Sequence, residues 1–251
     1  MDMITGHDMV KAFGVGEERR RVLDGVSVEI GEGEFVAVMG PSGSGKSTLL
    51  FALSGMDHLD SGTVSFAGRD LSALDSEELA SLRRTQMGFV FQQATLLKNL
   101  NLLDNIILPA VRENRKNAQG IIARAKMLMS KTGIAELEKR DITQVSGGQL
   151  QRAGICRALM GSPKVIFGDE PTGALNSRSA EEIMDIFTDI HTEGTTVMLV
   201  TYDAQVAART QRILFMRDGS IVSEMRLSKY EGHSMDNRIG AVTAKMREIG
   251  I

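Results

Sequence analysis

The sequence predicts an α/β protein whose core is a largely parallel sheet covered by helices. After residue 35, apolar segments of strand length alternate with amphipathic helical segments, which is the pattern of successive strand–helix–strand units. The clearest strand is Phe35–Met39, a continuous apolar run of the kind that is buried on both faces of a sheet. The chain also contains 26 glycines among 251 residues without a repeat period, which indicates loops whose backbone itself makes contacts.

Composition argues against several classes of protein. Hydrophobic residues make up 42% and charged residues 24%, as in an average globular protein with a packed core. No apolar run approaches the ~18 residues of a membrane span, and the most apolar stretches, among them Asn105–Val111, have the length of strands. A net charge of −3 argues against a broad basic surface for nucleic acid. The single cysteine, Cys156, and a first segment without a signal-peptide pattern favour the cytoplasm.

The N-terminal part is predicted to consist mainly of strands. Val22–Ile30 contains alternating apolar residues, and a glycine-containing turn at 31–34 separates it from Phe35–Met39. Gly62–Ala67 alternates again. A helix is expected at Asp75–Leu82, because its first residues have the spacing of a capping box.

The remainder is predicted to alternate between helices and strands. The expected elements are helices at Asn117–Thr132, Ser146–Met160 and Ser179–Thr192, strands at Val165–Phe167 and Thr195–Thr201, a hairpin at Arg212–Glu224 that turns at Asp218-Gly219, and a terminal helix from Met235. The stretch from about 87 to 161 is mostly helical and interrupts the strand–helix pattern. We therefore expect a helical subdomain inserted into the core that carries the sheet.

One glycine-rich segment fits a specific phosphate-binding motif. It follows Phe35–Met39, opens a helix at Lys46–Ser54 and has the spacing G-x-x-x-x-G-K-[ST]. Glycines allow successive backbone N–H groups to turn toward an anion, and the helix N-terminus adds a favourable partial charge. We expect the Lys46 side chain to reach the β- and γ-phosphates and the Ser47 hydroxyl to bind Mg²⁺. The predicted nucleotide contacts are Gly40, Pro41, Ser42, Gly43, Ser44, Gly45, Lys46, Ser47 and Thr48.

A pair of carboxylates follows the apolar strand Val165–Phe167. Asp169 and Glu170 stand at the carboxyl end of a predicted parallel strand, where α/β sheets bind their ligands. Alone, the pair would be a solvated strand end, but the phosphate-binding motif in the same chain favours catalysis. We expect Asp169 to hold Mg²⁺ through water and Glu170 to orient or deprotonate the attacking water.

The segment Val145–Arg152, with the sequence VSGGQLQR, closely resembles the signature sequence of ATP-binding cassette (ABC) proteins. Its residues also predict a serine-capped helix, and hence a second helix N-terminus that can bind an anion. The resemblance extends over about 3–223. It implies a P-loop NTPase core of the ABC ATPase type, with an N-terminal antiparallel β subdomain and an inserted α-helical subdomain.

The resemblance also implies an organisation for the whole chain. Residues 1–251 form one ABC ATPase domain, with a core at about 1–90 and 162–225, a helical subdomain at about 91–161 and a helical tail at about 235–251. Two copies are expected to form a head-to-tail homodimer that sandwiches two ATP molecules. In that dimer, the residues that close over the phosphate loop of the opposite copy are Ser146, Gly147, Gly148 and Gln149.

Two further positions match residues of this family. Phe13 matches the aromatic residue that stacks on the adenine, which is more often tyrosine in the family. Gln92 matches the glutamine that contacts Mg²⁺ and water and relays to the membrane partner. The segments 87–109 and 169–176 are similar to the ATPases of macrolide-efflux, lipoprotein-releasing and bacitracin-type antimicrobial-peptide transporters.

That branch implies coupling to a separate membrane permease, with the ATPase bound to the inner face of the membrane. ATP-driven dimer closure is then transmitted mechanically through the permease. The residues expected either to line the groove for the permease or to belong to the subdomain core are Leu96, Leu97, Leu100, Leu102 and Leu103.

Two positions depart from the family pattern. Tyr202 stands where the family has the switch histidine that contacts the γ-phosphate, and Asn176 stands where an aspartate is usual. Tyrosine can donate a hydrogen bond but stays neutral at pH 7. An alternative to the transporter ATPase is therefore a regulatory subunit with impaired hydrolysis. ABC ATPases of chromosome maintenance, DNA repair or ribosomes carry insertions that this sequence lacks, and the four histidines do not have the spacing of a zinc site.

Overall fold

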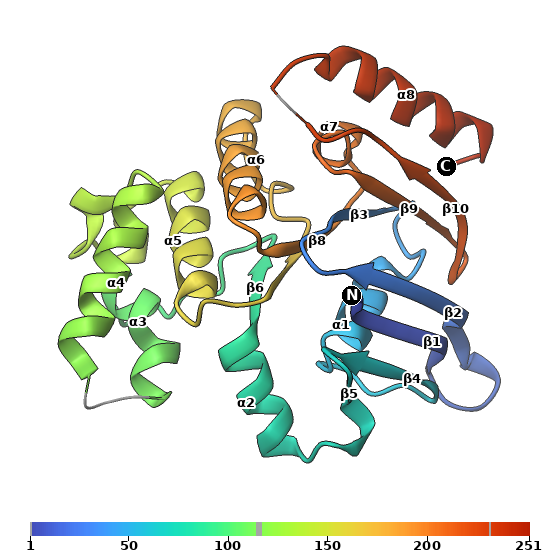
Figure 1. Ribbon diagram of the computed structural model, residues 1–251, viewed down its shortest axis with the longest axis horizontal. Helices are drawn as coiled ribbons and strands as arrows, with labels where there is room; N and C mark the ends of the chain where they lie inside the picture. The colour runs from blue at the N-terminus through green and yellow to red at the C-terminus, as the bar shows by residue number, and fades with distance from the viewer. Residues whose placement is uncertain (1, 114–116, 231) are drawn as a thin grey trace. The chain divides into compact units, whose positions relative to one another are not determined.

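The computed structural model describes residues 2–113, 117–230 and 232–251 and divides into two compact units (Figure 1). The first unit is made of Met1–Ala80 and Gly194–Ile251, and the second of Ser81–Glu193. Helix α2 (Ser76–Gln86) passes from one to the other. The expected core and helical subdomain have different bounds from these units, and their assignment stays a prediction. Of the expected helical subdomain, Asn114, Arg115 and Lys116 lie outside the described residues.

An antiparallel sheet opens the first unit. Its strands follow the order β2-β1-β4-β5, and their bounds are β1 Asp2–Phe13, β2 Arg20–Gly31, β4 Ser61–Phe66 and β5 Arg69–Asp70. Ile4 of β1 pairs with Ile30 on one side and Phe66 on the other, and all three side chains are buried. The expected N-terminal antiparallel sheet is therefore confirmed. Strand β1 was missed, because its apolar residues do not alternate regularly across its bulges.

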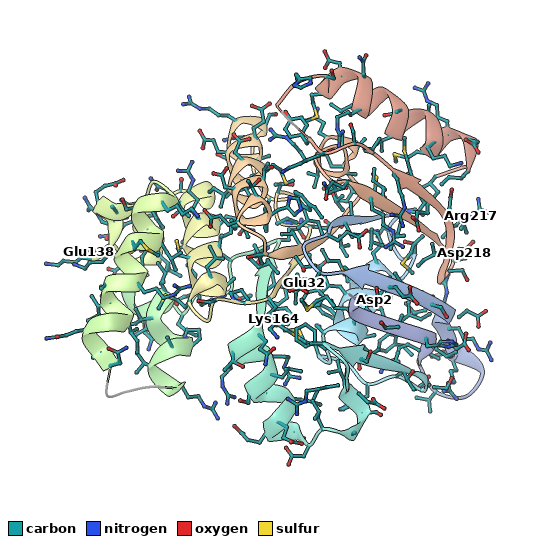
Figure 2. All side chains as sticks on the ribbon, viewed as in Figure 1. Asp2, Glu32, Glu138, Lys164, Arg217 and Asp218 are labelled. Carbon is teal, nitrogen blue, oxygen red and sulfur yellow. The ribbon has the colours of Figure 1, made fainter. Side chains whose placement is uncertain are left out.

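The second sheet of this unit contains the strand that leads into the phosphate-binding motif. Of the six strands of this sheet, four belong to the first unit and follow the order β10-β9-β3-β8. Their bounds are β3 Phe35–Met39, β8 Thr196–Thr201, β9 Arg212–Arg217 and β10 Ser220–Arg226. Strand β3 runs parallel to both β8 and β9 and is buried along its whole length. The predicted hairpin is present, and Figure 2 shows Arg217 and Asp218 at its turn. Asp218 and Gly219 both have positive φ, as a two-residue hairpin turn requires.

Three helices complete the first unit. Helix α1 (Lys46–Leu53) follows β3, α7 (Ala204–Ala207) follows β8, and α8 (Met235–Glu248) ends the chain. Helix α8 lies beside β9 and β10 in Figure 1. A cluster of apolar residues joins α7 and α8 to the sheet: Ala37, Met39, Ala207, Ala208, Ile213, Phe215 and Val242. The predicted terminal helix is confirmed, whereas α7 was missed because it is only one turn long.

The second unit combines a pair of parallel strands with four further helices. Strands β6 (Met87–Phe91) and β7 (Val165–Asp169) pair in parallel. The helices are α3 (Leu102–Glu113), α4 (Ala118–Lys131), α5 (Gly147–Leu159) and α6 (Ser177–Thr192). The apolar stretch Asn105–Val111, whose length suggested a strand, lies inside α3. Its helix is favoured because Leu102 and Ile106, one turn apart, are both fully buried in the same core.

Cys156 belongs to this helical core. Its thiol lies 3.1 Å from the Thr132 hydroxyl. Burial raises the pKa of the Cys156 thiol to about 11, so the side chain is a packed thiol and not an activated nucleophile. Within the part of the chain that the structure describes, no helix combines the length and apolar character that crossing a bilayer needs.

Candidate nucleotide site

The phosphate-binding motif forms a tight loop between β3 and α1. Gly43 and Gly45 have φ values of 78° and 100°, in the left-handed region that favours glycine. Gly40 and Gly45 are also fixed by close approach: a Cβ would lie 2.2 Å from the Met216 carbonyl oxygen at Gly40 and 2.4 Å from the Val22 carbonyl oxygen at Gly45. A side chain at either position would collide with the backbone of a neighbouring strand, so glycine is required at both.

The Lys46 side chain folds back into this loop. It is buried at 6% exposure, and its Nζ donates to the carbonyl oxygens of Gly40 and Pro41, each at 2.9 Å. The ammonium group is therefore held at the centre of the loop. A phosphate oxygen carries negative charge and accepts a stronger hydrogen bond from an ammonium group than a carbonyl oxygen does.

Two further observations fit a phosphate in the loop. The Ser44 hydroxyl is buried, and it has no hydrogen-bond partner among the described residues. Helix α1 begins after Gly45, so no side chain caps its N-terminus. A buried donor and an uncapped helix N-terminus are the groups that an anion satisfies. The half-buried Ser47 and Thr48 follow in the first turn, and the exposed Ser42 stands in the loop.

Tyr202 emerges at the same edge of the sheet as this loop. Met39 of β3 pairs with Thr201 of β8, so the next residues, Gly40 and Tyr202, leave neighbouring parallel strands at the same end. The Tyr202 side chain is 54% exposed. The next residue, Asp203, is the N-cap of α7, and its carboxylate accepts a hydrogen bond from the Gln205 N–H at 2.7 Å.

Phe13 ends strand β1 in the same unit and presents an open ring. Its side chain is 48% exposed. The Lys11 Nζ lies 5.1 Å from the centre of the ring and donates to the Asp57 carboxylate at 2.7 Å. The ring is therefore braced along one side and available for stacking on the other, as the predicted adenine contact requires.

Asp60 fixes the segment around Phe13. Its carboxylate accepts hydrogen bonds from the Ala12 N–H at 2.9 Å and from Arg19 at 3.0 Å. These bonds lower the pKa of the Asp60 carboxyl below its ordinary value. Asp60 was not predicted as a site residue, and a lone aspartate after a helix gives no signal for such a role.

The predicted catalytic carboxylates and Gln92 lie at the ends of two paired strands of the second unit. Phe91 of β6 pairs with Asp169 of β7, so Gln92 and Glu170 leave the two parallel strands at the same end. Glu170 has a φ of 47°, an unusual backbone conformation for a residue with a side chain. The exposed Gln92 side chain lies close to the loop that follows Glu170, since a Cβ on Gly173 would lie 2.9 Å from its Nε2.

The signature segment forms the start of α5. Ser146 is the N-cap and accepts a hydrogen bond from the Gln149 N–H at 3.3 Å, while the Gln149 side chain accepts one from the Ser146 N–H at 2.8 Å. Gly147 and Gly148 form the first turn, which leaves the helix N-terminus without bulky side chains. The expected serine-capped helix is therefore present.

Asn176 has a local role. Its side chain caps α6 and accepts a hydrogen bond from the Ser179 N–H at 2.9 Å. Asparagine and aspartate cap helices about equally well. The departure from the family pattern thus keeps the helix cap and changes only the charge at this point.

The structure groups the predicted residues into two sets. Phe13, the phosphate loop and Tyr202 belong to the first unit, and the signature residues, Gln92, Asp169 and Glu170 to the second. Sequence reasoning missed Gln151, a buried glutamine that hydrogen-bonds to Phe91 at the end of β6 and to Pro171 in the turn after β7. Only its place inside the signature segment could have drawn attention to it.

Comparison with known proteins identifies the family. The profile of the ABC transporter family matches residues 23–173. A macrolide export ATP-binding/permease protein (MacB) of Bradyrhizobium diazoefficiens is 45% identical over 216 residues, which cover 86% of this chain and 33% of that protein. This chain therefore spans about a third of the length of the macrolide-export relatives. An uncharacterized ABC transporter ATP-binding protein of Bacillus subtilis (YknY) is 42% identical, over 88% of this chain and 95% of its own length.

Solved structures of the same family have the same fold. The dimeric ATP-binding cassette MJ0796, in a post-hydrolysis state bound to ADP and phosphate, superimposes with a TM-score of 0.84 at 36% identity, covering 91% of this chain and all of that one. A nucleotide-free cassette from an ABC transporter superimposes with a TM-score of 0.80 at 26% identity, over 100% and 99% of the two chains. The α/β fold of ABC ATPases that the sequence predicts is confirmed. The chain belongs to the ABC transporter family, as one of its ATPase cassettes.

Proposed function

We propose that this chain binds ATP at Gly40–Thr48 and hydrolyses it to drive membrane transport. The observation that carries the proposal is the loop between β3 and α1, which holds the buried Lys46 side chain and a buried Ser44 hydroxyl that has no partner among the described residues. In this role Lys46 holds the β- and γ-phosphates, and Phe13 stacks on the adenine. Tyr202, at the same edge of the sheet, donates a hydrogen bond toward the γ-phosphate.

Catalysis needs a group that takes a proton from the attacking water. Glu170 is assigned that role, and Gln92 orients the water beside it. Ser47, Asp169 and Gln92 offer a hydroxyl, a carboxylate and an amide oxygen, the hard oxygen ligands that Mg²⁺ prefers. Bound together with the nucleotide, Mg²⁺ offsets the negative charge of the phosphates. A single protein carboxylate suits this ion, which keeps waters and phosphate oxygens as its other ligands.

The active form in this proposal is a head-to-tail homodimer. Two features support it. The chain carries one phosphate loop with a lysine and a second anion-binding helix N-terminus at Ser146–Gln149 without one. Two solved structures of one relative, MJ0796, at 36% and 38% identity, are dimeric cassettes. In the dimer, the signature residues of one copy close over the ATP that is bound by the other.

The names of the relatives support a permease partner. The macrolide-export relatives combine ATP binding and permease in their names, whereas the chain matches YknY over nearly its full length. We assign this cassette to a separate permease of the mechanotransmission branch that handles antimicrobial peptides, macrolides or lipoproteins, and place it peripherally on the cytoplasmic face of the cell membrane. Leu97 is 46% exposed and suits a permease contact, whereas Leu96 and Leu102 are buried in the core of the second unit.

A second candidate function is a regulatory cassette that binds ATP but hydrolyses it slowly. The observation in its favour is Tyr202, because a phenol has no cationic form that could replace a protonated histidine. Asn176 adds less weight, because it caps α6 as an aspartate would. Phosphate release by the purified chain together with its permease separates the two functions.

Dimer formation provides the test of the proposal. The Glu170→Gln variant should bind MgATP without turning it over and elute as a dimer in size-exclusion chromatography, while the Glu170→Gln/Lys46→Ala double variant should remain a monomer. A Glu170→Gln variant that binds ATP but stays monomeric at saturating ATP would contradict the sandwich dimer.

A further inference from the structure

Gln151 lies in α5, five residues after the cap residue Ser146, and its side chain is turned into the protein. The residue is buried at 2% exposure. Its Nε2 donates one hydrogen bond to the Phe91 carbonyl oxygen at 2.8 Å and another to the Pro171 carbonyl oxygen at 2.7 Å. Both protons of the amide group are therefore used, and both go to backbone oxygens outside its own helix.

The two carbonyl groups stand beside the residues assigned to hydrolysis. Phe91 ends β6 and directly precedes Gln92, and Pro171 directly follows Glu170. Phe91 and Asp169 are register partners in the parallel pair. One buried amide group thus ties together the two chain segments that carry Gln92 and Glu170 away from the sheet.

The backbone at Glu170 needs such support. A φ of 47° is unfavourable for a residue with a side chain and persists only where the surroundings hold it. The turn is closed by a hydrogen bond from the Gly173 N–H to the Glu170 carbonyl oxygen at 3.0 Å. The bond from Gln151 to Pro171 holds the peptide in the middle of that turn.

We infer that Gln151 is a positioning residue for hydrolysis, which sets the directions of Gln92 and Glu170 and connects them to the signature helix. The inference rests on the proposed function. Ser146 and Gln151 belong to one helix, and Ser146 is assigned to the ATP of the opposite copy. Closure of the dimer at the start of α5 is thereby transmitted through Gln151 to the hydrolytic groups of the same copy.

Replacement of Gln151 by glutamate distinguishes a positioning role from a merely structural one. A protonated carboxyl at this position donates one of the two hydrogen bonds, whereas an ionised carboxylate donates none and repels both carbonyl oxygens. The kcat of the Gln151→Glu variant relative to wild type should therefore recover as pH is lowered, from about 100-fold below wild type at pH 8 to about 10-fold or less at pH 6. The Gln151→Leu variant should be impaired about equally at both values.

The controls separate positioning from folding and from nucleotide binding. The Gln119→Glu variant introduces the same charge at an exposed site on α4 and should match wild type at both pH values. The dissociation constant for ATP, measured with a fluorescent analogue, should change less than about threefold in every variant, because the substitutions leave the phosphate loop and Phe13 unchanged. Melting temperatures establish that each variant is folded, and the pH comparison within Gln151→Glu stands even where Gln151→Leu does not fold.

Two results would overturn the inference. One is a Gln151→Glu variant whose kcat relative to wild type is the same at pH 6 and pH 8. The other is a loss that lies wholly in ATP binding with kcat unchanged. Wild-type protein that releases no phosphate would contradict the proposed function instead, so the two failures are distinguishable.

Discussion

Gly40 and Tyr202 leave neighbouring parallel strands at the same end, one residue beyond the register pair Met39 and Thr201. The first residue of the phosphate loop and the residue at the switch position are therefore adjacent in the sheet, although 162 positions separate them in the sequence. At this edge the resemblance to the family predicts a departure, a tyrosine where a histidine is usual. The consequence for the rate of hydrolysis can be measured directly.

The Tyr202→His variant is expected to raise kcat. A histidine can carry positive charge near the γ-phosphate, and a lost charged contact in such a site costs about 10- to 1,000-fold in rate. Steady-state phosphate release measures the change, and the dissociation constant for ATP should stay within about threefold. Tyr202→Phe serves as the control and should lower kcat if the phenol donates a hydrogen bond. Equal kcat for wild type and Tyr202→His would show that tyrosine is fully adequate.

The Phe13→Ala variant is expected to weaken ATP binding. Stacking of a base on an aromatic ring contributes about 1–3 kcal/mol, so the dissociation constant should rise about 5-fold or more. Calorimetric titration with ATP measures the loss. Phe13→Tyr should bind as wild type does, and tripolyphosphate, which has no base, should bind equally to all three proteins. A parallel loss of tripolyphosphate binding would argue that Phe13 supports the loop and not the base.

The contribution of Asp60 to stability is expected to depend on pH. Hydrogen bonds from Ala12 and Arg19 lower the pKa of its carboxyl below 3.8 in the folded chain. A carboxyl whose pKa is depressed by folding stabilises the protein above its unfolded pKa and loses that contribution as pH falls through the folded pKa. The difference in unfolding free energy between wild type and Asp60→Asn should therefore be constant at about pH 5–7 and shrink below about pH 4.

Urea unfolding across this pH range provides the measurement. Asp24→Asn is a suitable control, since Asp24 bonds to Arg21 three residues away and does not connect distant segments. A difference between wild type and Asp60→Asn that grows as the pH falls below 4 would contradict the assignment.

Asn176 is expected to stabilise the fold as the cap of α6, and replacing it by the charged aspartate should have little effect on stability. Removal of an N-cap side chain costs about 1 kcal/mol, so Asn176→Ala should lower the free energy of unfolding by about that amount. Asn176→Asp keeps the acceptor for the Ser179 N–H and should stay within about 0.5 kcal/mol of wild type. Urea unfolding of the three proteins decides the matter. A neutral effect of Asn176→Ala would show that the cap at α6 is dispensable.

Features that depend on local sequence could be predicted, and those that depend on distant partners could not. The run Phe35–Met39 with the glycines after it specified a strand, a loop and a helix, because the pattern is continuous along the chain. Strand β1 has an irregular pattern, and its pairing with β2 and β4 gives it its place. The apolar part of α3 was ambiguous because a short apolar run fits a strand or a buried helix, and Pro109 within it obscured the helical periodicity.

The site divides in the same way. Lys46, Glu170 and the signature residues belong to short motifs, so the sequence alone was enough to select them. Gln151 acts through hydrogen bonds to residues 20 and 60 positions away, and Asp60 through hydrogen bonds to residues 41 and 48 positions away. The sequence does not predict these hydrogen bonds, even for Gln151 within the signature segment, because they are made in the tertiary fold.

Phosphate release by the purified wild-type chain and its Glu170→Gln variant tests the central claim most directly. The account predicts that wild type releases phosphate at a rate that saturates with MgATP. In the Glu170→Gln variant kcat should fall by about 100-fold or more, because the group that accepts the proton from water is lost. Equal turnover by the two proteins would contradict the assignment of Glu170 and, with it, the mechanism proposed for this cassette.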